Sequence, residues 1–487
     1  MELLDPGRWT GRVLSGTWRV PHGGALPITA PATGATIGTA GRADATDIAD
    51  ATARAAAAQP AWAATGPRDR AAVLDRAAAV LDTYRAEIVA WSMRETGAVR
   101  AKAAHEIGLA IGELRAASAL ATGSQGELLP GVDAAQYGMA RRVPIGVAGV
   151  IAPWNAPLML GIRAVAPALA LGNAVVLKPD PQTPVTGGFV LALALAEAGL
   201  PSDVLHVLPG GADAGEALVA SPHTSVLSFT GSTAAGRRVG AVAGGLLKRV
   251  VLELGGNNAH IVLDDADVSA AVNNGMWGAF THNGQICMAA GRHLVHESVA
   301  EEYVRLLTER TAALKVGDPC ADDAVRIGPL INERQVARVH GIVTATVAAG
   351  ARARTGGTYD GPYYRPTVLS GVRPGMRAFD EEVFGPVAPV TTFTSDDEAV
   401  ELANATEYGL SAAVQTRATG RGQALARRLR VGMAHVNGQP IGDAPHLPMG
   451  GMGASGNGGR YGGRWNLDEF TYWQWLSVRD EPLAYPI

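Results

Sequence analysis

The chain has 487 residues, of which 47% are hydrophobic and 18% charged, and its formal net charge is -4 with a pI of about 6.3. These values exclude a disordered chain and a basic surface for nucleic acid or anionic membranes. No apolar span reaches the length of a membrane helix, the N-terminal residues lack a signal-peptide pattern, and two cysteines are too few for a disulfide framework. We therefore expect a soluble cytoplasmic protein of about two to four domains.

Ala-rich amphipathic patterns over residues 45–92 and 101–122 predict the first helices. Leu128–Gly131 predicts a turn, and the stretch from there to Arg142 predicts an arm. Apolar and helical segments then alternate: we expect strands over 145–152, 174–177, 204–208, 225–229 and 249–254, and helices over about 158–171 and from about 183. This alternation predicts an α/β fold with a doubly wound parallel sheet.

A second α/β region is expected from near Gly255 to about residue 464. The segment that follows it, residues 467–478, is aromatic and strand-like. Because so much aromatic surface is usually buried against a neighbour, we expect this tail to form an interface between subunits.

Two short motifs carry a carboxylate and a thiol. Glu253 lies in the apolar run 249–254 just before a Gly-Gly turn, and Cys287 follows the glycine turn at Gly284. A thiolate can attack a carbonyl, and a carboxylate can activate water against the resulting thioester. An unperturbed cysteine is only a few per cent thiolate at pH 7, so such a site must lower its pKa or supply a base. Each motif alone also fits a buried inert cysteine or an ordinary turn.

A third motif, Pro153-Trp154-Asn155, follows the expected strand 145–152. Ligands of parallel sheets bind at the carboxyl ends of strands, which is where Asn155 is expected. Its amide could donate to a developing oxyanion, and loss of one such donor costs about 100- to 1000-fold in rate. Taken alone, the motif also fits a capped turn before a helix.

Together with further motifs in order, these residues resemble the aldehyde dehydrogenase superfamily from roughly residue 30 to the C-terminus. The other motifs are Gly172–Pro179, Phe229–Ser232, Glu253–Gly256, Gly284–Cys287, Glu381–Pro386, Pro448–Gly451 and Ser455-Gly456. The resemblance implies a dinucleotide-binding domain of residues 1–122 and 143–253, a catalytic domain of residues 254–464, and a small β oligomerisation arm of residues 123–142 and 465–487. It also implies that arm and tail pair across a homodimer or homotetramer.

The resemblance implies a nicotinamide cofactor, NAD with NADP tolerated. The implied cofactor-binding residues are Ile151, Pro153, Trp154, Lys178, Pro181, Gly211, Phe229, Gly231, Ser232, Leu254, Glu382 and Phe384. Gly231-Ser232 opens an expected helix whose backbone N–H groups can approach a pyrophosphate, although the G-x-G-x-x-G fingerprint is absent. Lys178 is one of only four lysines among 41 basic residues. Pro181 stands where NAD-preferring relatives usually carry an acid, which weakens repulsion of a 2′-phosphate.

For chemistry, the resemblance implies that Cys287 attacks an aldehyde to give a thiohemiacetal, with the oxyanion held by Asn155 and the backbone N–H of Cys287. Hydride loss leaves a thioester, which Glu253 helps water to hydrolyse. Two segments, Lys178–Pro181 and the tail Asn466–Trp475, are similar to the benzaldehyde and vanillin dehydrogenase branch, which implies an aromatic aldehyde as the small-molecule substrate. Expected pocket residues are Ala156, Leu160, Thr281, Met288, His446 and Met449.

Several alternatives remain at this point. Arg163 could hold a carboxylate-bearing semialdehyde, or could pack with its charge paired inside the fold. A semialdehyde or aliphatic aldehyde dehydrogenase, a coenzyme A-acylating relative and an inactive nucleotide-binding structural protein are the competing functions. His282, Cys287, His293 and His296 are close in sequence, but His293 and His296 would point to opposite faces of a strand, so no metal is expected. Cys320 is expected to be a bystander in a turn.

Overall fold

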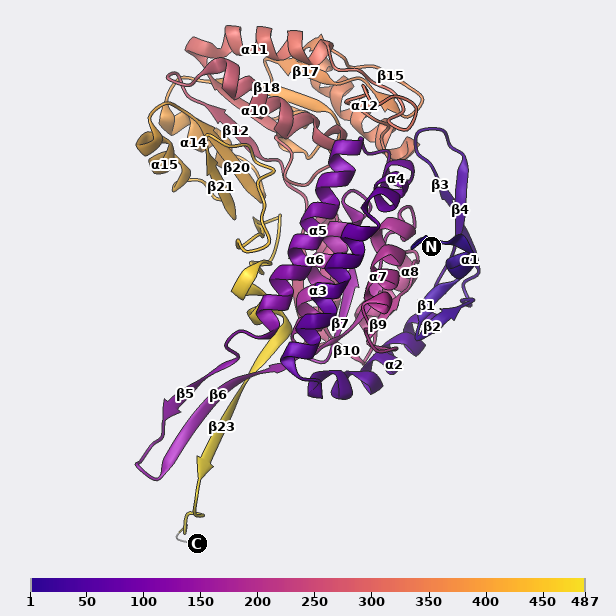
Figure 1. The fold of residues 1–487 in the computed structure, drawn as a ribbon. Helices are drawn as coiled ribbons and strands as arrows, with labels where there is room; N and C mark the ends of the chain where they lie inside the picture. Colours follow the sequence, from indigo (N-terminus) through magenta and orange to yellow (C-terminus); the bar gives the residue numbers. More distant parts are fainter. Residues whose placement is uncertain (1, 486–487) are drawn as a thin grey trace.

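The computed structural model describes residues 2–485; residue 1 and residues 486–487, at the ends of the expected dinucleotide-binding domain and arm, lie outside the described residues. Figure 1 shows two α/β lobes, each built around a sheet, and a three-stranded arm that extends away from them with the C-terminus at its far end. Within residues 2–485 no helix has both the length and the apolar character needed to cross a bilayer.

The first lobe contains a seven-stranded sheet in the order β11-β10-β7-β8-β9-β1-β2. Its parallel strands are β7 (Val147–Ile151), β8 (Ala174–Lys178), β9 (Leu205–Val207), β10 (Thr224–Thr230) and β11 (Arg249–Glu253), and β1 (Val13–Ser15) and β2 (Thr17–Arg19) add antiparallel pairs at one edge. All five residues of β7 and of β8 are buried, as expected for strands covered on both faces. The chain order reverses between β7 and β10, which opens a crevice at their carboxyl ends.

Helices cover both faces of this sheet, so the doubly wound prediction is confirmed. One core joins the sheet to α3 (Pro67–Thr83), α4 (Arg85–Thr96), α5 (Arg100–Ala121), α6 (Pro157–Ala170) and α7 (Val190–Glu197). The opposite core joins it to α2 (Ala45–Ala64), α8 (Ala212–Ala220) and α9 (Thr233–Gly245). The region expected to be helical over 45–92 is three helices, because Gly66 precedes a proline that starts α3 and Tyr84 separates α3 from α4.

The second lobe contains a seven-stranded sheet in the order β14-β17-β18-β13-β12-β20-β21, in which only β14 is antiparallel to its neighbour. The strands are β12 (Ala259–Val262), β13 (Arg292–His296), β14 (Arg352–Thr355), β17 (Thr367–Ser370), β18 (Val387–Phe393), β20 (Ser411–Gln415) and β21 (Met433–Val436). One face packs on α10 (Val268–Phe280) and α11 (Glu297–Ala312). The other packs on α12 (Glu333–Ala348), α14 (Asp396–Asn404) and α15 (Thr419–Ala426).

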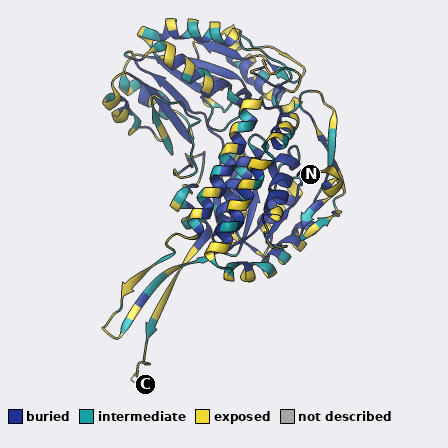
Figure 2. Ribbon diagram, viewed as in Figure 1, coloured by how far each residue is buried: buried dark blue, intermediate teal, exposed yellow. Residues whose placement is uncertain are grey.

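The arm consists of β5 (Gly126–Pro130), β6 (Gln136–Pro144) and β23 (Thr471–Arg479) in the order β23-β6-β5. Figure 2 shows its strands mainly in the colours of intermediate and exposed residues. Large apolar side chains are exposed on it, including Leu128 at 72% and Trp475 at 71%.

Two local expectations in this region were wrong. The predicted turn at 128–131 is strand as far as Pro130, because residues 126–130 pair with β6 and the chain reverses only afterwards. The first residues of the expected tail strand, up to Phe470, belong instead to helix α16 (Asn466–Phe470), because Phe470 is fully buried in the first core and not paired in the arm.

The remaining elements are short. They are α1 (Pro6–Trp9), β3 (Ala25–Thr29), β4 (Thr36–Gly41), the π-helix Val185–Phe189, the 3-10 helices Thr281–Gly284 and Gly463–Trp465, β15 (Tyr359–Asp360), β16 (Tyr363–Tyr364), α13 (Arg377–Asp380), β19 (Tyr408–Gly409) and β22 (Met452–Gly453). After β22 the chain returns to the first sheet, where Gly456 bridges Glu253 and the backbone N–H of Leu254 donates to the Ser455 carbonyl.

Candidate active site

Cys287 follows an unusual turn at the end of α10. His282 and Asn283 adopt left-handed φ values of 50° and 59°, and Gly284 follows with φ 68°. Such values are costly for residues other than glycine, so the surroundings must hold them. The Asn283 side chain does so: its Oδ1 accepts from Gly328 N at 2.8 Å and its Nδ2 donates to Pro329 O at 2.9 Å. A Cβ on Gly284 would lie 2.1 Å from the Gly385 carbonyl oxygen, so only glycine fits there.

Asn258, which directly precedes strand β12, anchors the cysteine backbone. Its Nδ2 donates to the carbonyl oxygens of Cys287 and Ala289, both at 2.8 Å, and its Oδ1 accepts from Ser411 N at 2.9 Å. The sequence analysis missed this residue; the only signal was a pair of asparagines, Asn257-Asn258, directly after the glycines that follow Glu253.

Asn155 lies in the connection between β7 and α6 and reaches the same loop. Its side chain is only 5% exposed, and its Nδ2 donates to the carbonyl oxygen of Gln285 at 2.9 Å. The contact is two residues before Cys287, so the structure brings the predicted amide donor and the predicted thiol together. A primary amide carries two hydrogens, and one remains for another acceptor.

Glu253, the last residue of β11, is only 3% exposed. Neither of its carboxylate oxygens makes a hydrogen bond of normal geometry among residues 2–485, although the backbone N–H of Gly451 lies near enough to lower its pKa. Burial raises the pKa of Glu253 to about 8, against the opposing charges of Arg163 and Arg460. A carboxyl group with a pKa near neutrality can act as a general base. A Cβ on Gly450 would lie 2.9 Å from Glu253 Oε1, so the glycine leaves space beside the carboxylate.

The resting thiol of Cys287 is protonated at neutral pH. Burial raises the pKa of Cys287 to about 12, and the charges of Glu382 and Glu253 add to this effect. Cys287 packs against the buried cluster of Met288, Leu410 and Met449. Two of the expected pocket residues, Met288 and Met449, therefore lie beside the thiol.

The crevice at the carboxyl ends of β7, β8 and β10 gathers most of the expected cofactor residues. Ile151 is paired in register with both Lys178 and Phe229. Gly231 supports the ring of Phe229, because a Cβ on it would lie 2.7 Å from Phe229 Cζ. Gly211 and Ser232 are the N-caps of α8 and α9, whose N-terminal N–H groups are suited to bind phosphate.

Glu382 and Phe384 of the second lobe are also expected at the cofactor. Glu382 Oε1 accepts from Gly256 N at 3.0 Å, and burial raises the pKa of Glu382 to about 7. The rings of Trp154 and Phe384 meet edge to face with centroids 5.5 Å apart. Leu254, also expected at the cofactor, is buried against α9, where a Cβ on Gly236 would lie 2.3 Å from its Cδ2.

Lys178 is buried, and its Nζ donates to the carbonyl oxygens of Gly210 at 3.0 Å and Pro179 at 3.3 Å. Its third ammonium hydrogen remains for a ligand. The chemistry of this crevice, with two helix N-termini, a lysine and close-packed glycines, fits a dinucleotide.

Comparison with known proteins agrees with this geometry. The model of the aldehyde dehydrogenase family matches residues 18–476. The chain belongs to the aldehyde dehydrogenase family. It is 50% identical over 485 residues to a benzaldehyde dehydrogenase [NAD(+)] of Pseudomonas putida, with 100% of this chain and 99% of that protein covered. It is 52% identical over 487 residues to a vanillin dehydrogenase of Amycolatopsis sp., with 100% of both chains covered.

Among solved structures, the chain is similar to a salicylaldehyde dehydrogenase from Pseudomonas putida G7 complexed with salicylaldehyde. The TM-score is 0.95 at 33% identity, with 98% of this chain and 99% of that chain covered. The expected family and fold are thus confirmed, and the chain is an NAD(P)-dependent oxidoreductase acting on aldehydes.

The other pocket residues expected of this aldehyde dehydrogenase lie on several elements. Ala156 is the N-cap of α6 and Leu160 lies half-buried in its first turn, while Thr281 ends α10. His446 is exposed and lines a groove at the base of the arm together with Arg142 and Trp473. The buried cluster beside Cys287 contains the two methionines but not His446.

Arg163 is buried on α6 with its charge paired. Its Nε donates to Glu113 Oε1 at 3.2 Å and its Nη2 donates to Asp443 Oδ2. Of the two readings left open by the sequence, the paired arginine is the one present. Two neutralising carboxylates leave it a poor site for a substrate carboxylate.

Pro181 lies on a groove between the β3–β4 hairpin and the start of α12. The neighbouring Asp180 is engaged in its own turn, since its Oδ1 accepts from Gln182 N at 2.9 Å. One oxygen of Asp180 is therefore bonded to the backbone, which leaves this side chain less free to bind ribose hydroxyls in place of the acid missing at Pro181.

The histidines near Cys287 have separate surroundings. His293 and His296 both lie on β13; His293 bonds the Tyr303 hydroxyl at 2.7 Å, and His296 bonds Ser298 at 2.8 Å. His282 is buried next to the cysteine turn. Cys320 is exposed in a turn.

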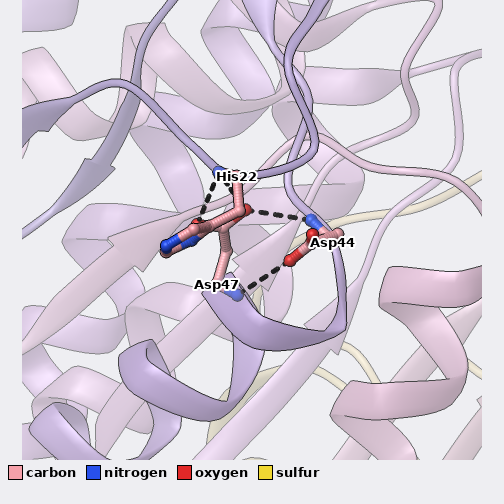
Figure 3. A group of neighbouring side chains, drawn as sticks. All are labelled: His22, Asp44 and Asp47. Carbon is pink, nitrogen blue, oxygen red and sulfur yellow. Dashed lines mark hydrogen bonds and ion pairs between the residues drawn. The ribbon is translucent and has the colours of Figure 1, made fainter.

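Of the residues described, one cluster, His22, Asp44 and Asp47, has the spacing of metal ligands (Figure 3). Both Asp47 oxygens are occupied: they accept from the backbone N–H groups of His22 and Asp44 and from the His22 ring. Asp44 and Asp47 form the capping box of α2. The cluster is explained as a helix cap.

Proposed function

We propose that this aldehyde dehydrogenase oxidises an aromatic aldehyde, of the benzaldehyde or vanillin type, to the carboxylic acid, with Cys287 as nucleophile, Asn155 as oxyanion donor and Glu253 as base. The observation that carries the proposal is the convergence of the Asn155 amide on the Cys287 loop, beside an unpartnered Glu253 carboxylate.

The residues can perform the reaction in two stages. The thiol of Cys287 first gives its proton to solvent water. Sγ then bonds to the aldehyde carbon as the carbonyl π bond opens, and the carbonyl oxygen becomes an oxyanion that accepts from Asn155 Nδ2 and from the backbone N–H of Cys287. When bound, the nicotinamide supplies the acceptor for the hydride, and a thioester of Cys287 remains. Glu253 then takes a proton from water, whose oxygen adds to the thioester carbon; the C–S bond breaks and the acid leaves.

The cofactor is proposed to lie across the crevice, with its phosphates near Gly231 and Ser232, an adenosine ribose near Lys178, and its nicotinamide ribose held by Glu382. Because Pro181 places no carboxylate beside the ribose, we propose NAD use with NADP tolerated. Trp154 and Phe384, whose rings already meet, would border the phosphate and nicotinamide ends.

The proposed substrate class rests on the walls of the site and on the relatives. Met288 and Met449 beside the thiol are apolar and adaptable, and Ala156 leaves room for a ring. Arg163 is the buried arginine whose charge lowers the pKa of Glu253 most, and it is neutralised by ion pairs with Glu113 and Asp443. Relatives named for benzaldehyde and vanillin are 50% and 52% identical.

We also propose the domain limits given above and a homodimer or homotetramer formed through the arm. The exposed apolar residues of β5, β6 and β23 support this assembly.

Steady-state kinetics on a panel of benzaldehyde, vanillin, hexanal and succinic semialdehyde, each with NAD and NADP, test the substrate proposal. The aromatic aldehydes should have kcat/KM values at least about tenfold above the other two, a difference of roughly 1.4 kcal/mol. A preference for succinic semialdehyde would show that the Arg163 region accepts a carboxylate and would reject the aromatic assignment.

A further inference from the structure

A buried ion pair, Lys102 and Glu106, lies directly behind Asn155. The two residues are one turn apart on α5, with side chains only 8% and 4% exposed, and Lys102 Nζ is 2.6 Å from Glu106 Oε2. A buried charged pair is retained only if its remaining hydrogen-bonding capacity is used. Both partners use theirs on the segment that begins at Asn155.

Lys102 holds the backbone of Asn155 itself. Its Nζ donates to the Asn155 carbonyl oxygen at 2.8 Å. This is the carbonyl of the residue whose side chain reaches the Gln285 carbonyl in the cysteine loop at 2.9 Å. The direction of the amide therefore depends on a backbone position that the ammonium group fixes.

Glu106 holds the next residues. Its Oε1 accepts from Leu158 N at 2.9 Å and from Met159 N at 3.3 Å, in the first turn of α6. These N–H groups have no partner within the helix, and the N-cap of α6, Ala156, has no side chain that could bond them. The carboxylate supplied by α5 replaces the missing cap and is favoured there by the helix dipole.

We infer that Lys102 and Glu106 form a positioning pair for Asn155 in aldehyde oxidation. The hydrogen bonds of the pair hold the connection between β7 and α6 on both sides of Ala156, so that the amide of Asn155 points at the oxyanion position. The inference rests on the proposed oxyanion role of Asn155. It gives a task to one of only four lysines in an arginine-rich chain.

A single ammonium suits this task better than a guanidinium. Glu106 offers only one oxygen to the cation, since the other is bonded to the backbone of α6. A guanidinium binds carboxylates through two parallel hydrogen bonds and would compete for that second oxygen. Lys102→Arg is therefore expected to recover only part of the rate lost in Lys102→Met.

The test starts from Lys102→Met, which removes the charge and both hydrogen bonds at similar length. We expect kcat for an aromatic aldehyde to fall about 10- to 100-fold, because small misplacements of a reacting group cost up to about 100-fold. The dissociation constant for NAD should be unchanged. The matched control is Lys248→Met: Lys248 also donates to backbone carbonyls, those of Val219 and Ser221, but lies away from the site, and this variant should keep its kcat.

A double-mutant cycle with Asn155→Ala separates positioning from general damage. If Lys102 acts through Asn155, adding Lys102→Met to Asn155→Ala should cost less than about threefold, far from the product of the single losses. Independent, multiplying losses would overturn the inference, and so would an unchanged kcat in Lys102→Met. No loss in Asn155→Ala itself would instead reject the oxyanion role and thus the proposed function.

If Lys102→Met fails to fold, Glu106→Gln can replace it in the double-mutant cycle with Asn155→Ala. Its amide oxygen can still accept from the α6 N–H groups, but the charge that attracts Lys102 is gone. We expect a smaller loss in kcat, about 3- to 10-fold, that also disappears in the Asn155→Ala background. A loss that persists in that background would overturn the inference.

Discussion

The loop that carries Cys287 and the strand end that carries Glu253 meet at the same site but are held in opposite ways. Asn258 and Asn155 donate to backbone carbonyls of the loop, and Asn283, within the loop, donates to the Pro329 carbonyl. Glu253, although only 3% exposed, has a carboxylate that makes no hydrogen bond of normal geometry among residues 2–485. An unpartnered buried carboxylate is costly, and the raised pKa of Glu253 reflects that cost.

The difference suggests a division of labour. A nucleophile gains rate from a fixed direction of attack, so its backbone is pinned. A base that acts only in the second stage must meet a water that arrives late, so a side chain without fixed bonds is an advantage. Variants that alter either the Cys287 loop or the Glu253 carboxylate separate the two roles.

The largest effect is expected from removing the nucleophile. Cys287→Ala should lower aldehyde oxidation by at least about 10⁴-fold, because loss of a covalent nucleophile costs up to about 10⁶-fold in other enzymes. NADH formation measured by absorbance checks this. Cys320→Ala, at an exposed turn, is the control and should be fully active. Residual activity above one per cent in Cys287→Ala would mean that another group attacks the substrate.

Removing the base should affect only the second stage. Glu253→Gln should lower steady-state turnover about 10²- to 10⁴-fold, the usual range for a general base. In a stopped-flow experiment the first equivalent of NADH should still form as a burst, since thiohemiacetal formation and hydride loss precede deacylation. Loss of the burst in proportion to turnover would assign Glu253 to activation of the thiol instead.

Removing hydrogen bonds that fix the Cys287 loop should lower kcat less than removing the nucleophile or the base. Asn258→Ala removes the bonds to the Cys287 and Ala289 carbonyls and should lower kcat about 10- to 100-fold, because the thiol loses its direction. Unfolding free energy should drop by about 1–3 kcal/mol, as the buried carbonyls lose their partner. Asn274→Ala, which removes a hydrogen bond from α10 to Gln415 on β20, is the matched control and should leave kcat unchanged. A similar kcat loss in both variants would indicate a general packing effect.

The pH dependence of deacylation tests the role of the Glu253 carboxylate. Glu253 acts as a base only when deprotonated, so deacylation should rise about tenfold per pH unit below its pKa of about 8 and level off above it. Arg460 lowers that pKa, so Arg460→Gln should move the rise to higher pH, while Arg460→Lys should leave it in place. Arg163 is unsuitable for this test because its removal would leave Glu113 and Asp443 unpaired. A rate that is flat between pH 6 and pH 9 would mean that another step limits turnover.

The smallest effect concerns the cofactor. NAD and NADP should differ by less than about a thousandfold in kcat/KM, roughly 4 kcal/mol. Pro181→Glu should raise the ratio in favour of NAD about tenfold, since a carboxylate binds ribose hydroxyls and repels a 2′-phosphate. An unchanged ratio would place the ribose away from Pro181, which borders a groove towards α12.

The alternation of strands and helices in the sequence was sufficient to predict the first sheet, because fully buried strands such as β7 and β8 are continuous apolar runs. The order of the strands and the end of the arm were not predictable in this way. Phe470 is aromatic like the residues of the tail strand, yet it is buried in the core of the first lobe. The local sequence pattern does not show whether such a residue packs in the core or pairs in the arm.

The same limit applies to the site. Cys287, Glu253 and Asn155 stand in recognisable motifs, whereas Asn258, Lys102 and Glu106 act on backbone atoms of other segments and leave no local pattern. His446 was expected to line the substrate pocket, yet it lies in a groove at the base of the arm and outside the buried cluster beside Cys287.

The most direct test of the account is to look for the covalent intermediate. Glu253→Gln is mixed with vanillin and NAD, quenched in acid and analysed by peptide mass spectrometry. We predict that the peptide containing Cys287 gains the mass of the vanilloyl group, and that Asn155→Ala introduced into the same variant slows its appearance. An unmodified Cys287 peptide under conditions in which NADH has formed would contradict a thioester on this residue.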